Sequence, residues 1–132
     1  MPVGVARLFE QPNDVRPHAF ILAVPDLDRS VRYFIDVLGF QPEWRDEDNW
    51  QSVVRGEVRM MLGRCPDAPS PRDIGDHSYF AYLLVDDVDA LHTQFLGKGA
   101  LILRAPEDKP WGRREMAVAT PDGHRMMFGQ MI

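Results

Sequence analysis

The apolar residues change their spacing in an order that repeats along the chain. Residues 19–24 form a short apolar run with the length of a buried strand. Asp26 then suits a helix N-cap, and apolar residues recur at helical spacing from Leu27 to Leu38. Gly39 suits the end of that helix. The pattern next predicts three strands, at residues 41–45, 49–55 and 58–63.

The second half repeats this order. A strand predicted at residues 79–85 precedes a helix whose buried stripe includes Val88, Leu91 and Phe95. Three strands are predicted after it, at residues 101–105, 114–120 and 125–131. Two βαβββ modules of this kind predict an α+β fold, in which a concave mixed sheet surrounds a central cleft.

Similar hexapeptides close the two modules. VRMMLG occupies residues 58–63, and HRMMFG occupies residues 124–129. The repeat divides the chain into an N-terminal extension, a first module, a linker rich in proline and aspartate, and a second module, at residues 1–17, 18–63, 64–78 and 79–132. All four belong to a single structural domain. The apolar stretch VGVARLF, residues 3–9, either adds or exchanges a strand or lies loose at the chain end.

Strand alternation assigns side chains to two faces, one toward the helix and one toward the cleft. Met60 and Met126 are predicted to pack under the helices, and Met61 and Met127 to face the cleft. The cleft is then apolar and suits a planar small molecule. The predicted ligand-binding residues are Ala19, Ile21, Trp44, Trp50, Met61, Phe80, Tyr82, Trp111 and Met127, with Arg59 and Arg125 at the rim for an anionic group. The tryptophans can instead pack in the core or in a dimer interface, and the arginines can be exposed strand residues.

Composition narrows the choice of partners. The chain is 45% hydrophobic and carries a net charge of −5, with no cluster of basic residues, which argues against a nucleic-acid surface. No apolar window approaches the length of a membrane span, and the first residues do not resemble a signal peptide. Cys65 is the single cysteine, so no intrachain disulfide is possible. We expect a soluble cytoplasmic protein that binds neither membrane nor nucleic acid.

Three stretches together resemble the vicinal-oxygen-chelate superfamily. They are LAVPDLDRSVRYFIDVLGF, VDDVDAL and PWGRREMAVATPDGHRMMFG, and they span roughly residues 18–130. This superfamily is the glyoxalase, bleomycin-resistance and extradiol-dioxygenase group, and the last stretch is most similar to its bleomycin-resistance branch. The resemblance implies paired βαβββ modules, a concave site and a homodimer. It leaves function open, because the superfamily contains both metal enzymes and simple binding proteins.

Metal enzymes of the superfamily carry His, Glu or Gln ligands on the first and last strands of each module. The matching positions read Ala19, Met61, Phe80 and Met127, none of which suits a hard divalent ion. We therefore expect no metal and no cofactor. The other possible donors are expected to be surface or turn residues or solvated charges: His18, His77, His92, His124, Glu57, Glu107 and Glu115.

The first hypothesis is a metal-independent protein that binds an apolar or aromatic drug-like molecule or metabolite, in the manner of an antibiotic-resistance protein rather than an enzyme. The alternative is a metal-dependent lyase or dioxygenase that uses displaced ligands such as His18, His77 or Glu57. A third reading is a scaffold or regulatory dimer whose cleft is vestigial. No catalytic residue is identified, because Cys65 has no evident neighbouring base and no nucleophile or phosphate-loop motif is present.

Overall fold

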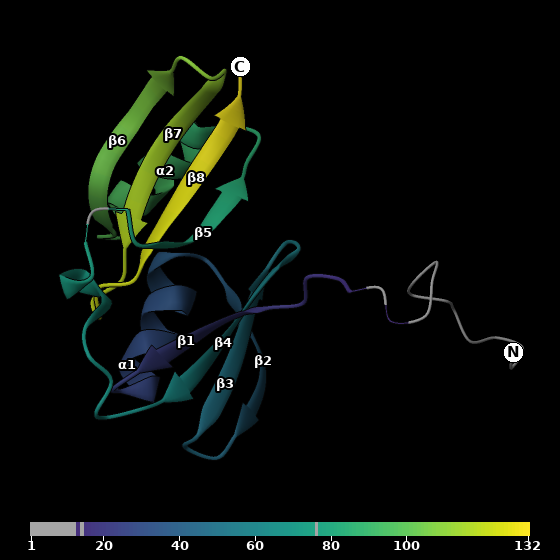
Figure 1. Ribbon diagram of the computed structural model, residues 1–132, viewed down its shortest axis with the longest axis vertical. Helices are drawn as coiled ribbons and strands as arrows, with labels where there is room; N and C mark the ends of the chain where they lie inside the picture. Colours follow the sequence, from purple (N-terminus) through teal and green to yellow (C-terminus); the bar gives the residue numbers. More distant parts are fainter. Residues whose placement is uncertain (1–12, 14, 76) are drawn as a thin grey trace, which may run out of the picture.

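The computed structural model describes residues 13, 15–75 and 77–132 (Figure 1). Most of the predicted N-terminal extension, including residues 3–9, lies outside these residues. The first module contains β1 (Phe20–Val24), α1 (Leu27–Arg32), a π-helical turn (Tyr33–Val37), β2 (Gln41–Asp46), β3 (Trp50–Arg55) and β4 (Val58–Arg64). After a 3-10 turn (Pro71–Asp73) in the linker, the second module contains β5 (Tyr79–Leu84), α2 (Val88–Gly97), β6 (Leu101–Lys109), β7 (Arg113–Ala119) and β8 (Arg125–Met131).

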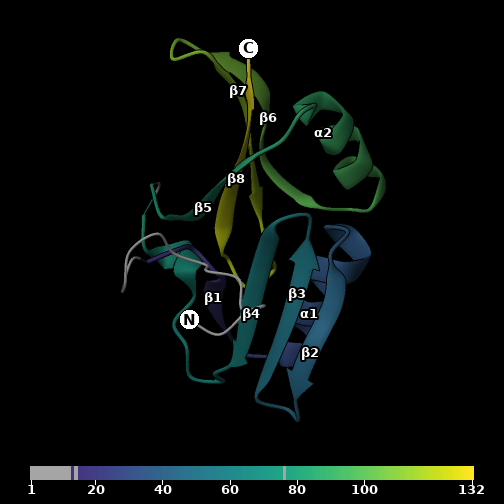
Figure 2. The ribbon, with the colours of Figure 1, turned by 90° about the vertical axis from the view of Figure 1, so that its right-hand side faces the viewer.

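The strands form two four-stranded sheets, one in each module. Their orders are β1-β4-β3-β2 and β5-β8-β7-β6. In each sheet the first and last strands of the module pair in parallel, and the remaining pairs are antiparallel. The predicted α+β class and the βαβββ modules are confirmed, with two separate sheets in place of one continuous sheet. Each sheet has a helix over one face, and the face away from the helix is called here the open face (Figures 1 and 2).

The first helix begins as predicted and then changes from an α-helix to a π-helical turn. The Asp26 side chain accepts a hydrogen bond from the Arg29 backbone N–H at 3.1 Å, as an N-cap does. The α-helix changes into a π-helical turn at Tyr33, whose side chain is buried in the core beside Phe34. Gly39 follows with a φ of 78°, a left-handed conformation that favours glycine. The sequence predicted this boundary but not the π-helical turn, because apolar spacing alone does not distinguish the two helix types.

Alternation along the strands separates core from open face. Met60 and Met126 are fully buried, whereas Met61 and Met127, the next residues along, are half-buried on the open faces. Ile21 on β1 is 66% exposed between half-buried Phe20 and buried Leu22. The core is continuous across both modules, since one cluster of buried side chains contains residues from each sheet and from both helices.

Phe80 departs from this alternation. The β5–β8 register shifts between Tyr79 and Ala81, so Phe80 is an extra residue in the strand. Its ring packs edge-on against Phe20 at 5.9 Å and against His124 at 6.2 Å, next to the core. The prediction that alternation turns Phe80 toward an open cleft is therefore wrong, because a β-bulge interrupts the period at this residue.

The turn between β7 and β8 joins the second module to α1. Asp122 in this turn accepts hydrogen bonds from the Arg29 guanidinium and from Ser30 Oγ, the latter at 2.6 Å. The Tyr33 hydroxyl donates to the Ala119 carbonyl at 2.9 Å and accepts from the Leu101 N–H at 2.9 Å. These buried groups satisfy one another, so this module contact is closed by a polar network.

The linker packs against the same turn. Ser70 Oγ donates to the Asp122 carbonyl at 3.0 Å, and Arg72 donates to the Pro121 carbonyl at 3.0 Å. A Cβ on Gly123 would lie 2.8 Å from the Arg72 backbone nitrogen, so only glycine fits between turn and linker. His124, at the end of the turn, is 6% exposed. The prediction of a surface or turn histidine is therefore wrong in its exposure, because the linker and β1 cover the residue.

The turn between β3 and β4 makes the corresponding contact with α2. Arg55 Nη2 donates to Gln94 Oε1 at 3.2 Å, and the guanidinium lies 5.9 Å from the centre of the Phe95 ring. Arg55 Nη1 also donates to the Leu38 carbonyl at 2.7 Å. This contact is more exposed than that of the β7–β8 turn.

One edge strand of each sheet, β2 or β6, pairs irregularly with its neighbour. The β2–β3 register shifts between Pro42 and Arg45, and the β6–β7 register shifts twice between Ile102 and Glu107. Proline lies within each of these strands, as Pro42 and Pro106. No helix among the described residues is long and apolar enough to cross a membrane.

Candidate ligand-binding site

The open face of the second module contains small residues, Ala117 and Gly129, beside larger side chains. Met127 on β8 lies between Tyr82 on β5 and Ala117 on β7, and Gly129 lies opposite Glu115. The Tyr82 ring lies against Gly129, where even a Cβ would collide with the hydroxyl end of the ring. Glycine at this position therefore allows the tyrosine to lie over the sheet.

Glu115 is the buried carboxylate of this face. The residue is 7% exposed, and its Oε2 accepts hydrogen bonds from the Tyr82 hydroxyl at 2.7 Å and from Trp111 Nε1 at 2.8 Å. The prediction that Glu115 is a solvated charge is wrong, because Tyr82 and Trp111 cover it. The alternation of Glu115 with Ala117 and Ala119 on β7 was the available signal for its direction. Its burial depends on Tyr82, in a distant strand, and on how the β6–β7 turn places Trp111.

The Tyr82 hydroxyl is held in its neutral form. Burial raises the pKa of Tyr82, and the hydrogen bond to the Glu115 carboxylate raises it further. The Arg113 guanidinium, 5.9 Å from the ring centre, partly offsets this rise in the pKa of Tyr82. Tyr82 therefore acts as a hydrogen-bond donor to Glu115 near neutral pH.

The open face of the first module is aromatic at the matching position. Trp50 on β3 pairs with Gly63 on β4, and the indole covers Gly63 so closely that a Cβ there would lie 2.7 Å from it. Met61 lies between Ile21 on β1 and Ser52 on β3. The indole, the thioether and the isoleucine form a surface on which a flat apolar molecule can stack.

An ion pair borders this surface. Glu43 accepts hydrogen bonds from Ser52 Oγ at 2.7 Å and from Arg59 Nε and Nη2 at 2.7 and 2.8 Å. The Arg59 and Ser52 hydrogen bonds lower the pKa of the Glu43 carboxyl to about 2. Arg59, predicted at the rim, is thus neutralised by a carboxylate that the sequence did not single out.

The remaining predicted residues lie farther from these two surfaces. Trp44 is exposed on β2, with its backbone N–H 3.3 Å from Ser52 Oγ, and Ala19 is half-buried immediately before β1. Arg125 donates to the Gly75 carbonyl and, at 3.0 Å, to the Arg72 carbonyl. It therefore holds the linker.

The structure gathers the predicted residues into two groups. Ile21, Trp50 and Met61 share the open face of the first module, and Tyr82, Trp111 and Met127 belong to that of the second. The two open faces point in different directions: that of the second module faces the viewer in Figure 1, and that of the first module faces the viewer in Figure 2. One chain therefore presents two separate surfaces rather than one enclosed cleft.

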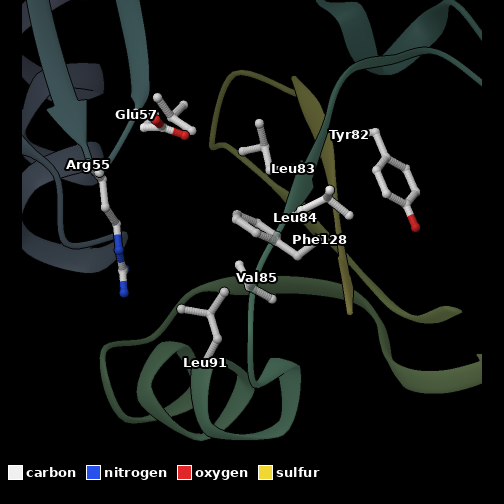
Figure 3. Close-up of a pocket in the computed structure, with 10 residues that line it drawn as sticks. Arg55, Glu57, Tyr82, Leu83, Leu84, Val85, Leu91 and Phe128 are labelled. Carbon is white, nitrogen blue, oxygen red and sulfur yellow. The ribbon is translucent and has the colours of Figure 1, made fainter. Parts of the chain in front are cut away.

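A hollow of about 520 Å³ lies between the modules, next to the β3–β4 turn. Figure 3 shows Arg55 and Glu57 on one side of it and the side chains of β5 and α2 on the other, with Tyr82 turned away. Its apolar lining comprises Val58, Leu83, Leu84, Val85, Leu91 and Phe128. The sequence did not predict this hollow, which exists only because the two modules lie side by side.

The residues considered as displaced metal ligands in the enzymatic alternative do not lie close together. His18, Glu57 and His77 are exposed on different segments. Across residues 13, 15–75 and 77–132, no three His, Cys, Asp or Glu side chains are grouped so as to hold a metal ion. The four family ligand positions themselves carry no nitrogen or oxygen donor in their side chains.

Sequence comparison gives one family and a set of uncharacterized relatives. The model of the Glyoxalase/Bleomycin resistance protein/Dioxygenase superfamily matches residues 16–128. An uncharacterized protein of Mycobacterium bovis is 38% identical over 80 residues, which are 61% of this chain and 51% of that protein. The match thus spans about half the length of this relative.

Solved structures share the whole architecture. TioX from Micromonospora sp. ML1 superposes with a TM-score of 0.72 at 27% identity, covering 89% of this chain and 100% of that one. The bleomycin-binding protein of Streptomyces verticillus, solved with copper(II)-bleomycin, gives a TM-score of 0.69 at 24% identity, covering 90% and 98%. The second likeness shows the fold alone.

Proposed function

Because the chain belongs to the Glyoxalase/Bleomycin resistance protein/Dioxygenase superfamily, we propose that it binds an apolar or aromatic small molecule without a metal. The observation that carries this proposal is the replacement of the family's metal ligands. Ala19, Met61, Phe80 and Met127 stand at those positions, within an intact pair of βαβββ modules. The modules therefore keep the family's fold, while the positions matched to its ligands carry none of the donors that metal chemistry needs.

The two open faces offer complementary walls for such a ligand. Trp50 and Met61 supply an apolar stacking surface in the first module. Tyr82 and Trp111 supply aromatic area in the second module, with a carboxylate between them. A flat molecule held between two such walls buries both of its faces, which is the main source of affinity in an apolar site.

We further propose that a second copy of the chain completes the site. The open faces of one chain point in different directions, so a single chain contacts only one face of a ligand. In a homodimer, the first-module face of one protomer can lie against the second-module face of the other. Large exposed side chains on or beside these faces, Ile21, Leu84 and Trp111, support an interface here.

The mechanism proposed is sequestration. A ligand enclosed between two protomers is removed from solution in proportion to the protein present, and no bond in it is changed. The bleomycin-binding protein of the same fold, solved with copper(II)-bleomycin, supports a drug-like ligand of this kind.

A pair of variants tests the place of binding. Acridine and copper(II)-bleomycin serve as probes in isothermal titration calorimetry. Trp50→Ala is expected to weaken acridine binding about tenfold or more, because it removes a stacking contact worth ~1.5 kcal/mol or more. The control is Val58→Trp, which fills the hollow beside the β3–β4 turn. If Val58→Trp abolishes binding and Trp50→Ala does not, the ligand occupies that hollow and the open-face site is wrong.

Metal content separates this proposal from the enzymatic alternative. We expect protein purified without chelators to contain no stoichiometric divalent metal and to bind its probe equally well after treatment with EDTA. A stoichiometric metal lost together with binding would support a metal-dependent lyase or dioxygenase instead.

A further inference from the structure

Glu115 is a buried carboxylate to which no described cation is bonded. Its two hydrogen bonds come from neutral groups, the Tyr82 hydroxyl and the Trp111 indole. Among the ion pairs of the described residues, none includes Glu115. A carboxylate removed from water without a cation lowers stability, so a purely structural residue here would more favourably be apolar.

The fold does not require an acid at this position. The β3 residue opposite Gly63 is Trp50, and the β7 residue opposite Gly129 is Glu115, so the two stand at equivalent points of the two modules. One module places an indole over its glycine, and the other places a carboxylate beside the glycine that Tyr82 covers. The difference marks Glu115 as specific to the second open face.

The neighbouring cations have other partners or positions. Lys109 pairs with Glu107 at 3.3 Å, and Arg114 pairs with Asp89 and Asp108. Arg113 lies over the Tyr82 ring, and Arg104 is exposed beside a second, smaller hollow that Glu115 also lines. None of these cations forms an ion pair with Glu115.

The geometry of the hydrogen bonds leaves one side of the carboxylate available. Tyr82 and Trp111 both donate to Oε2. Among the described residues no hydrogen bond to Oε1 is found, and none of their buried polar side-chain atoms lacks a partner, so Oε1 keeps contact with solvent. Glu115 lines a small hollow there with Ala117, Met127, Arg104 and Lys109. A ligand group that donates from this side meets a fixed, charged acceptor.

We infer that Glu115 selects a planar aromatic cation, binding an N–H group of the ligand through Oε1. This inference rests on the proposed function and names its ligand class. Tyr82 and Trp111 orient the carboxylate, and the stacking surface of a partner's first module covers the flat face of the ligand. Recognition of charge in the second module and of shape in the first then act together on one molecule.

The test uses two probes that share one ring system. Acridine is neutral near neutral pH, whereas 9-aminoacridine is protonated and carries N–H donors. In calorimetric titration of the full-length protein we expect 9-aminoacridine to bind about tenfold or more tightly than acridine, since a charged hydrogen bond contributes ~1.5–3 kcal/mol. Glu115→Gln should bring the two affinities to within about threefold of each other.

A matched variant controls for general charge effects. Glu107 lies opposite Glu115 on the neighbouring strand but is exposed and paired with Lys109, so Glu107→Gln should keep the preference for 9-aminoacridine. If Glu115→Gln does not fold, Glu115→Met replaces the buried acid by an apolar residue of similar length and should show the same loss of preference.

The outcomes separate the inference from the proposed function. If acridine binds but the wild-type protein shows no preference for 9-aminoacridine, or if the preference survives both Glu115 variants, the inference is overturned and the proposed function stands. If the wild-type protein binds neither acridine nor 9-aminoacridine, the proposal of an aromatic ligand and this inference fail together.

Discussion

The two modules hold each other through the same contact made twice, with different results. In each case the last hairpin turn of one module touches the helix of the other. The β7–β8 turn reaches α1 through Asp122, whose side chain is 3% exposed, and the linker covers it. The β3–β4 turn reaches α2 through Arg55, and beside it lies the hollow of about 520 Å³.

The difference indicates that the two equivalent contacts contribute unequally to the stability of the fold, although the two modules share one topology. One contact is a closed network of buried hydrogen bonds, which is costly to disturb because each broken bond leaves a partner unsatisfied. The other relies on a half-buried arginine and on apolar side chains that face a hollow, so we expect it to change with a smaller loss. We therefore expect the two contacts to differ in their response to mutation.

The largest effect is expected for Asp122→Ala. Removing this carboxylate leaves Arg29 and Ser30 without their partner. Breaking a buried ion pair costs roughly 3–5 kcal/mol, and because the Arg29 side chain is 48% exposed we expect about 2–3 kcal/mol from urea unfolding. The control is Asp28→Ala, an exposed partner of Arg45, which should cost less than about 1 kcal/mol. Equal losses in the two variants would show that the β7–β8 contact has no special weight.

Tyr33→Phe should have the next largest effect. The hydroxyl bridges the Ala119 carbonyl and the Leu101 N–H, and its loss leaves both backbone groups short of a partner. We expect the free energy of unfolding to fall by about 1–2 kcal/mol. Because the ring remains in the core, the m-value in urea should not change; a changed m-value would indicate altered packing instead.

The closed contact should also be sensitive to pH through His124. Burial lowers the pKa of His124 from its ordinary 6.5, outweighing the Asp122 charge and a hydrogen bond to the Ala23 backbone, both of which raise it. The folded state thus favours the neutral ring, whereas the unfolded chain takes up a proton below about pH 6.5. The stability that His124 contributes is complete above that pH and decreases as the pH falls toward the folded-state pKa.

Unfolding in urea at several pH values measures this effect. His124→Gln should flatten the dependence of the unfolding free energy on pH below about pH 6.5. His77→Gln, in the exposed linker, is the control and should retain the wild-type slope. A slope that His124→Gln leaves unchanged would assign the pH dependence to other groups.

Arg55→Ala should have the smallest effect. Its bond to Gln94 and its contact with the Phe95 ring lie at the surface, so we expect a loss of about 1 kcal/mol or less. The same urea titration provides the measurement. A loss as large as that of Asp122→Ala would mean that both module contacts are equally strong and that the hollow weakens neither.

Much of the fold followed from local periodicity. The β8 boundaries, the Asp26 N-cap and the burial of Met60 and Met126 all depend on residues close in sequence, and the structure agrees with each prediction. The α+β class and the two βαβββ modules were predicted for the same reason. The features that the sequence did not predict depend on contacts between residues far apart in the chain.

Three residues illustrate that limit. Phe80 was misassigned because a β-bulge shifts the register by one residue, and no local signal marks that bulge. His124 and Glu115 were expected near solvent, yet both are buried. His124 is covered by β1 and the linker, which lie elsewhere in the chain. Glu115 is covered in part by Trp111, whose position depends on the turn between β6 and β7. Burial of polar groups is therefore the property that required the structure.

The irregular outer strands also bear on how the protein behaves during expression and storage. Pro42 and the register shifts in β2, and Pro106 and those in β6, prevent regular pairing with strands of other molecules. The opposite edges of the two sheets are β1 and β5, which contain no proline, and β5 exposes Leu84 beside its edge. These two edges are therefore the parts of the sheets most open to pairing with strands of other molecules, and a partner that covered them would slow aggregation during storage.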